Sequence, residues 1–272
     1  GMGTVVPRLL NYAILTPFFT RIFKLGEYGV VTELYAYIVF LMVILTYGME
    51  TGYFRYAEKH KDPDEVFTTS LVSLFITSSL FITVVSVFSG EIAYILDYPE
   101  NREYFVMIGI IVGVDAFTAV PFARLRQKNK ALKFASIKIV SVIINVALNF
   151  MFLYFIPKYN LNEKYDIISR IYDESIGVGY VFISNMIASM VTLIMLLDEI
   201  LRVKIKFSKK LWTELILYSL PLLVAGLAGS INEALDRIML KHLIPDNLKP
   251  LEQLGIYGAN YKIAVLMQLF IQ

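Results

Sequence analysis

The sequence predicts an all-α protein that crosses a membrane several times. Three long stretches contain no Asp, Glu, Lys, Arg or His: residues 66–90, 175–197 and 215–232. A helix needs ~20 apolar residues to cross a hydrocarbon core about 30 Å thick, and each stretch comes close to or exceeds that length. Apolar residues make up 57% of the chain and charged residues only 18%, whereas about a quarter of the residues in soluble domains are charged.

The predicted helices follow the apolar stretches in order. We expect them at about residues 3–23, 30–53, 62–90, 102–122, 132–156, 175–197, 208–230 with an amphipathic continuation to 243, and from 255 onward. The third has the clearest start, because Asp62 is a good N-cap, Pro63 suits the first helical position and Glu65 suits the first turn. The last stretch is still apolar at Gln272, so we expect a fragment of a larger bundle.

Basic residues concentrate in the gaps after the fourth and sixth predicted helices. Those of the first gap are Arg124, Arg126, Lys128, Lys130 and Lys133, and those of the second are Arg202, Lys204, Lys206, Lys209 and Lys210. The gap after the third helix has only Arg102 among four acids. Because Lys and Arg are enriched in cytoplasmic loops, we expect the even-numbered gaps and the N-terminus to be cytoplasmic. The small net charge of +2 gives no indication of nucleic-acid binding.

Two similar pentapeptides indicate an internal repeat. Leu25–Gly29 reads LGEYG and Leu254–Gly258 reads LGIYG, and each follows a helix that begins near a proline and ends near an Arg-Ile pair. The copies lie six predicted helices apart, which gives both the same orientation and favours parallel repeats. We therefore expect a first lobe over residues 1–207 and the start of a second over 208–272. In this register Glu33 corresponds to Lys262, and the two are expected to pair across a central cleft.

Several charged residues fall at the depth of the hydrocarbon core. Arg8, Asp115 and Lys138 lie within predicted spans, where a charge costs ~2.5–3.5 kcal/mol even on the most lenient scale. Such residues normally face a water-filled path or a charged partner. The alternative to a functional role is that Asp115 and Lys138 simply form a structural ion pair with each other. At 100° per residue, one side of the second helix carries a polar stripe. Its members are Glu33, Tyr37, Tyr47, Thr51 and Arg55. Small polar residues elsewhere are equally consistent with hydrogen bonds between helices, worth ~0.6 kcal/mol each.

The order and spacing of several short motifs resemble a known family. The motifs are Pro7-Arg8-Leu9-Leu10, Arg21-Ile22-Phe23, Leu25–Gly29, Gly48–Tyr56, Asp236-Arg237-Ile238-Met239-Leu240 and Leu254–Ala264. Over essentially the whole chain they look like the polysaccharide and lipid-linked oligosaccharide flippases of the MATE-like (MOP) exporter superfamily, of the bacterial O-antigen and capsule type. The resemblance implies two six-helix lobes around a cavity. Arg8 reproduces the arginine that lipid II flippases have thirteen residues before Arg-Ile-Phe. Their next cationic position is Ile14 here, which disfavours lipid II itself.

The resemblance also implies a function and a site. The implied activity is flipping of a polyprenyl-pyrophosphate-linked oligosaccharide across a bacterial plasma membrane by alternating access, with a glycan polymerase as a possible partner. We expect Arg8, Arg55, Lys138 and Lys262 to neutralise the pyrophosphate. Tyr37 and Tyr47 are expected to stack on sugar, and Glu33, Glu50 or Asp115 to couple transport to an ion. No catalytic residue, cofactor or metal is expected. The chain has no cysteine for a thiolate metal site, and it has no GxxxxGK[ST] loop, so we do not expect it to hydrolyse ATP.

Two other functions remain open at this point. A cation-coupled multidrug exporter has the same predicted fold, but its cavity is expected to be acidic, and Arg8 and Lys138 argue against it. A membrane glycan polymerase or ligase is the third candidate. Such enzymes generally need a large loop outside the membrane or a close pair of carboxylates, and the predicted outer gaps are short.

Overall fold

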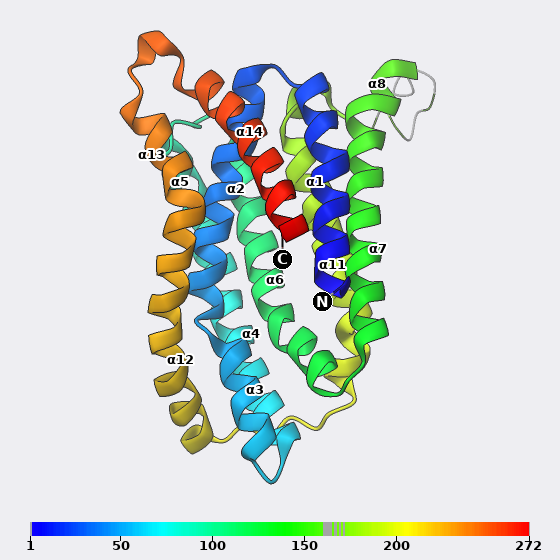
Figure 1. The fold of residues 1–272 in the computed structure, drawn as a ribbon, viewed down its shortest axis with the longest axis vertical. Coiled ribbons are helices and arrows are strands. Elements are labelled where there is room, and N and C mark those ends of the chain that lie inside the picture. The colour runs from blue at the N-terminus through cyan, green and yellow to red at the C-terminus, as the bar shows by residue number, and fades with distance from the viewer. Residues whose placement is uncertain (1, 160–164, 166–167, 169, 171, 272) are drawn as a thin grey trace. The chain divides into compact units, whose positions relative to one another are not determined.

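The structure is a computed structural model that describes residues 2–159, 165, 168, 170 and 172–271. Over these residues it contains helices and no strand (Figure 1). Six helical segments are long and apolar enough to cross a membrane: Leu25–Lys59, Pro63–Val87, Arg102–Gln127, Ala131–Tyr159, Gly179–Leu201 and Lys209–Ser230. The prediction of an all-α, multi-pass membrane protein is thus confirmed. The expected first and last spans are helical but are not among these six.

Most helix boundaries lie within a few residues of those predicted. In chain order the elements are α1 (Met2–Ile22), α2 (Leu25–Thr46), α3 (Met49–Lys59), α4 (Pro63–Val87), α5 (Ser89–Ile95), α6 (Arg102–Gln127), α7 (Ala131–Phe150), a π-helix (Met151–Phe155), α8 (Ile156–Tyr159), α11 (Gly179–Leu201), α12 (Lys209–Ser230), a second π-helix (Ile231–Leu235), α13 (Asp236–Leu243) and α14 (Pro250–Ile271). The second predicted helix breaks at Tyr47 and Gly48, whose φ angles are 35° and 72°. The third ends at Val87, before α5, and the fourth continues to Gln127.

The start of α4 follows from local chemistry, as predicted. The Asp62 carboxylate accepts hydrogen bonds from the backbone N–H groups of Asp64 (3.1 Å) and Glu65 (3.3 Å), and Pro63 opens the helix. The first N–H groups of a helix have no intrahelical partner, so this cap satisfies two of them.

The chain forms two compact units, each described here by itself. Unit 1 comprises residues 1–36, 138–188 and 236–272, and unit 2 comprises residues 37–137 and 189–235. The expected lobes at 1–207 and 208–272 stay a prediction.

Unit 2 is built around α6. In the most apolar window of α6, 72% of the residues are buried, against 28% for α4. The core between α3, α4, α6 and α12 contains Met49, Tyr53, Phe67, Val120 and Leu215. Because the uncovered face of α4 exposes Phe75, Ile76, Leu80 and Val84, it suits contact with lipid rather than water.

In unit 1, the two copies of the repeated pentapeptide pack against each other. A Cβ atom on Gly29 would lie 2.0 Å from the carbonyl oxygen of Leu251, and one on Gly255 would lie 2.2 Å from that of Leu25. Only glycine allows the backbones of α2 and α14 to come this close. We call this the glycine contact. It brings the helices that carry Glu33 and Lys262 together.

Candidate functional site

Five charged residues of unit 1 gather where α2, α13 and α14 meet, and we call them the α2–α14 charge cluster. Its members are Glu33, Asp236, Arg237, Lys241 and Lys262. The Glu33 side chain is fully buried, and its Oε1 lies 3.1 Å from Nζ of Lys241, whose side chain is 10% exposed. The structure therefore gives Glu33 an ion pair with Lys241, not the pairing with Lys262 expected from the repeat register.

Lys262 is the member of the cluster with the least compensation. Its Nζ lies 5.1 Å from the centroid of the Tyr28 ring, and Tyr28 is buried. Among the residues that the structure describes, no carboxylate lies within ion-pair distance of Lys262. An aromatic face attracts a cation but does not cancel its charge, so Lys262 remains able to bind an anion.

The third cation of the cluster, Arg237, combines an acid and an aromatic partner. Its Nε lies 3.8 Å from Oδ1 of Asp236, and its guanidinium carbon lies 4.1 Å from the centre of the Tyr261 ring. The other oxygen of Asp236 accepts a hydrogen bond from the Tyr257 hydroxyl. Asp236 is therefore shared between a cation and a neutral donor. The five named members of the cluster are three cations and two acids.

The arrangement suits an anion that carries an apolar or sugar-like ring nearby. Arginine and lysine side chains are the common ligands of phosphate oxygens, and sheltered sites strengthen such contacts because their effective dielectric constant is lower than that of water. Tyrosine rings beside the cations offer flat faces. Within the described part of the chain, no group of three or more His, Cys, Asp or Glu residues has the arrangement of a metal site.

Sequence reasoning missed Lys241 and did not treat Arg237 as a site residue. Both lie on α13, four residues apart, and therefore on one face of that helix. This spacing could have indicated that the two cations act together. What the sequence did not reveal is that this face meets α2 at Glu33, because the contact joins residues about two hundred positions apart.

Three of the predicted site residues that lie in unit 2, Tyr47, Glu50 and Arg55, have side-chain partners there. The Tyr47 hydroxyl hydrogen-bonds Ser73 Oγ at 2.8 Å, and that oxygen also accepts from Trp212 Nε1 at 2.8 Å. The Arg55 guanidinium lies 4.7 Å from the centre of the Tyr218 ring, and Glu50 accepts a hydrogen bond from Arg126. These contacts join α3 and the break before it to neighbouring helices, and the expected roles in sugar, phosphate or ion binding stay predictions.

The other predicted site residues are less well defined. The side chain of Arg8, on α1, lies outside the described residues. Tyr37, Asp115 and Lys138 are each half-buried and engaged with other residues of the protein. Of the predicted set, the structure brings Glu33 and Lys262 into one charged cluster.

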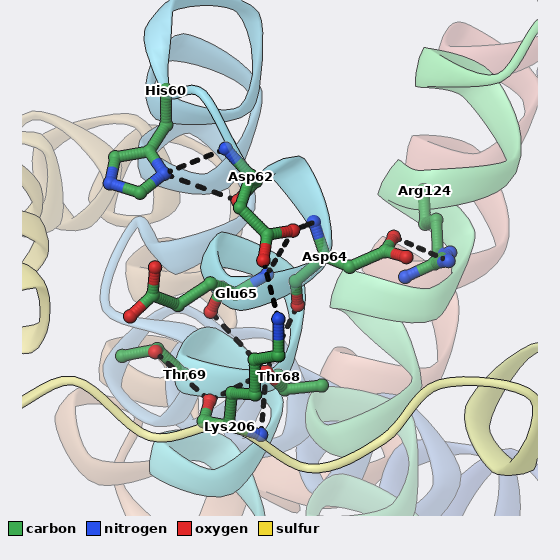
Figure 2. Close-up of polar contacts among 8 residues, drawn as sticks. All are labelled: His60, Asp62, Asp64, Glu65, Thr68, Thr69, Arg124 and Lys206. Atoms are coloured by element: carbon green, nitrogen blue, oxygen red, sulfur yellow. Dashed lines mark hydrogen bonds and ion pairs between the residues drawn. The ribbon is translucent and has the colours of Figure 1, made fainter.

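A second charged region lies in unit 2, and we call it the ion-paired end (Figure 2). Lys206 Nζ lies 2.8 Å from Asp62 Oδ2, and Arg124 Nη2 lies 2.9 Å from Asp64 Oδ1. The Thr68 hydroxyl donates to the carbonyl oxygen of Lys206 at 2.6 Å. The hydrogen bond between Lys206 and Asp62 lowers the pKa of the Asp62 carboxyl and raises the pKa of the Lys206 ammonium.

The ion-paired end brings three gaps of the chain together. Asp62 precedes α4, Arg124 lies in the last turn of α6 and Lys206 precedes α12. In the predicted topology these are the second, fourth and sixth gaps, which an alternating chain places on one side; the topology itself stays a prediction. Lys130 and Lys133 also pair with Glu199, at 2.6 and 2.9 Å. Acids thus offset much of the basic charge in this region.

The comparison with known proteins identifies one family. The profile of the family described as "Polysaccharide biosynthesis protein" matches residues 1–272, which is the entire chain. No curated protein and no solved structure matches the chain.

Proposed function

Because the chain belongs to the polysaccharide biosynthesis protein family, we propose that it flips a polyprenyl-pyrophosphate-linked oligosaccharide across a bacterial plasma membrane. Family membership and the six candidate spans support a multi-pass membrane protein of polysaccharide synthesis. The lipid-linked cargo and the direction, from the inner to the outer leaflet, are part of the proposal.

The observation that carries this proposal is the uncompensated Lys262 in the α2–α14 charge cluster. A pyrophosphate bears negative charge that must leave water when it crosses the membrane. Isolated charges are expensive in an apolar medium, so a site that moves them needs cations without fully matched acids. Lys262 supplies such a cation, and the rings of Tyr28 and Tyr261 lie against Lys262 and Arg237. The polyprenyl chain stays in lipid.

In the proposed cycle, access to the cluster alternates between the two faces of the membrane. The glycine contact between α2 and α14 is the natural place for movement, because small residues allow helices to separate and close again without repacking large side chains. Binding of a proton or a sodium ion by Glu33 releases Lys241 towards the substrate, which couples the ion to the cargo. The ion-paired end, the N-terminus and the even-numbered gaps are assigned to the cytoplasm.

The test uses the full-length protein in sealed vesicles. A fluorescent polyprenyl-pyrophosphate disaccharide is incorporated, and the fraction exposed to an external, membrane-impermeant quencher is followed with time. Replacing Lys262 by Ala is expected to lower the flipping rate at least 10-fold, because one lost charge–charge hydrogen bond is worth about 1.5–3 kcal/mol.

The matched control is Lys249→Ala, which removes an exposed lysine that pairs with Glu252. This variant is expected to flip at the normal rate. Equal rates for the Lys262 variant, the control and the wild type, with equal amounts of protein in the vesicles, would overturn the proposed role of the cluster. A cargo without pyrophosphate that flips equally well would overturn the proposed substrate class.

A further inference from the structure

A groove of about 670 Å³ opens in unit 2 between the end of α4, the short helix α5 and the start of α6. Its walls include Ser86, Gly90, Glu91, Tyr94, Ile95 and Arg102. This volume is in the range of pockets that hold a small molecule or a lipid headgroup. Neither the charge cluster nor the ion-paired end contributes a residue to it.

The groove lies at the level of a membrane surface. With 26 residues, α6 is about 39 Å long, which exceeds a hydrocarbon core of about 30 Å. Its two ends therefore reach the two interfaces. Arg124, at one end, belongs to the ion-paired end, whereas Arg102, at the other, lines the groove. The groove thus faces the leaflet opposite the ion-paired end.

An apolar strip leads along α4 to the groove. Its members are exposed and follow one another at helical spacing: Phe75, Ile76, Leu80, Val84 and Val87. Beyond the strip, Tyr94 and Ile95 in the groove wall are 76% and 73% exposed. Exposed tyrosine at the end of an apolar helix is typical of the membrane interface. A molecule with acyl chains can therefore lie on α4 and place its headgroup in the groove.

The charges of the groove indicate which headgroup fits. Arg102 offers a guanidinium for phosphate oxygens, and Glu91 offers a carboxylate for an ammonium group. The same gap carries the further acids Asp97, Glu100 and Glu103. This surplus of negative charge disfavours a purely anionic lipid. A headgroup with one phosphate and one ammonium is complementary to the pair.

We propose that this groove binds phosphatidylethanolamine from the leaflet opposite the ion-paired end. The lipid phosphate lies on Arg102, the ammonium group on Glu91, and the acyl chains along the apolar strip of α4. The serine hydroxyls near the junction of α4 and α5 give further polar contacts.

Binding is measured on the delipidated full-length protein by native mass spectrometry, with titrations of phosphatidylethanolamine, phosphatidylcholine and phosphatidylglycerol. The wild type is expected to retain one phosphatidylethanolamine at least 5-fold more tightly than either other lipid. The trimethylated ammonium of phosphatidylcholine and the glycerol headgroup of phosphatidylglycerol both lack the N–H groups that would donate hydrogen bonds to Glu91. Equal retention of the three lipids would mean non-specific annular binding and would overturn the proposal without any variant.

Two variants test the place of binding. A Cβ atom on Gly90 would meet no other atom within 4 Å, so Gly90→Trp is expected to fill the groove and abolish the preference. Gly229 in α12 is equally open, and Gly229→Trp is the matched control. The double change Arg102→Gln with Glu91→Gln is expected to reduce the preference at least 5-fold. The control Arg202→Gln, at a residue that pairs with Asp198 and does not line the groove, is expected to leave it unchanged. An unchanged preference in Gly90→Trp, with normal helical content and size, would overturn the assignment.

Discussion

The two charged regions of this protein differ in how completely their charges are matched. At the ion-paired end, Lys206 pairs with Asp62 and Arg124 with Asp64, and Lys206, Asp62 and Asp64 remain partly in contact with solvent. In the α2–α14 charge cluster, Glu33 is fully buried against Lys241, while Lys262 faces an aromatic ring. The first region fastens loops to helix ends. The second holds Lys262 beside the ring of the buried Tyr28, with no described carboxylate within ion-pair distance.

The difference teaches that a count of charges does not locate a binding site. The longest runs of basic residues in the sequence lie at the ion-paired end, and acids offset them there. The cluster is poorer in basic residues, but each of its cations lies in a setting where an unpaired charge is costly. Under the proposed function, a substrate anion gains most from a cation of the second kind, such as Lys262.

The largest loss of stability should come from breaking the buried ion pair between Glu33 and Lys241. Lys241→Ala leaves Glu33 without this partner, and removing one member of a buried ion pair costs about 3–5 kcal/mol in the free energy of unfolding. Denaturation of the purified protein in detergent measures the loss. The double variant Lys241→Ala with Glu33→Gln should recover most of the stability, because residue 33 then no longer carries a buried charge without its partner. A single variant as stable as the wild type would show that the pair contributes little.

Substitutions at the glycine contact should cause the next largest loss of stability. Gly255→Ala places a methyl group 2.2 Å from the carbonyl oxygen of Leu25, and overpacking of this kind costs about 1–3 kcal/mol. Because α2 and α14 must move apart to accept it, flipping should slow as well. Gly229→Ala, with open space around the new Cβ, is the control in the same thermal unfolding and vesicle assays. Identical behaviour of the two variants would argue against a close contact between α2 and α14.

Substitutions at the ion-paired end should cost less stability, and the cost should be larger for a buried side chain than for an exposed one. The Arg124 side chain is 4% exposed, and its guanidinium carbon lies 4.1 Å from the Phe67 ring centre. Arg124→Gln should cost about 1–2 kcal/mol, since it removes a cation–π contact and a charged hydrogen bond. Lys206→Gln, at a side chain that is 59% exposed, should change the unfolding midpoint little. The reverse order of the two effects would contradict this account.

The smallest effect should appear only in acid. The folded-state pKa of Asp62 lies below its ordinary value of 3.8 because Lys206 donates a hydrogen bond to it. The pair therefore stabilises the fold above pH 3.8, and this contribution is lost as the pH falls through the lower folded-state value. Asp62→Asn keeps an N-cap acceptor but removes the charge. The difference in melting temperature between wild type and variant should be constant near neutral pH and should vanish in acid, and a difference that grows in acid would contradict it.

Sequence reasoning predicted local features better than partners. The start of α4 at Asp62 and Pro63 was predicted because a cap depends on residues three positions apart. The break at Tyr47 and Gly48 was missed, since glycine is tolerated inside membrane helices. In the structure Gly48 has a φ of 72°, and a Cβ there would lie 2.9 Å from the carbonyl oxygen of Ser219 in α12. That requirement comes from a distant helix and is not visible in the local sequence.

The sequence by itself determined that the chain is a bundle of membrane helices with basic and acidic gaps. Transfer of a helix into lipid depends on some twenty contiguous residues, so composition within each stretch is sufficient. Only the tertiary structure decided that Lys241, and not Lys262, neutralises Glu33, and that the two glycine pentapeptides meet. Ion pairs act over a few ångströms, and which residues come within that distance depends on the packing of helices that lie far apart in the chain.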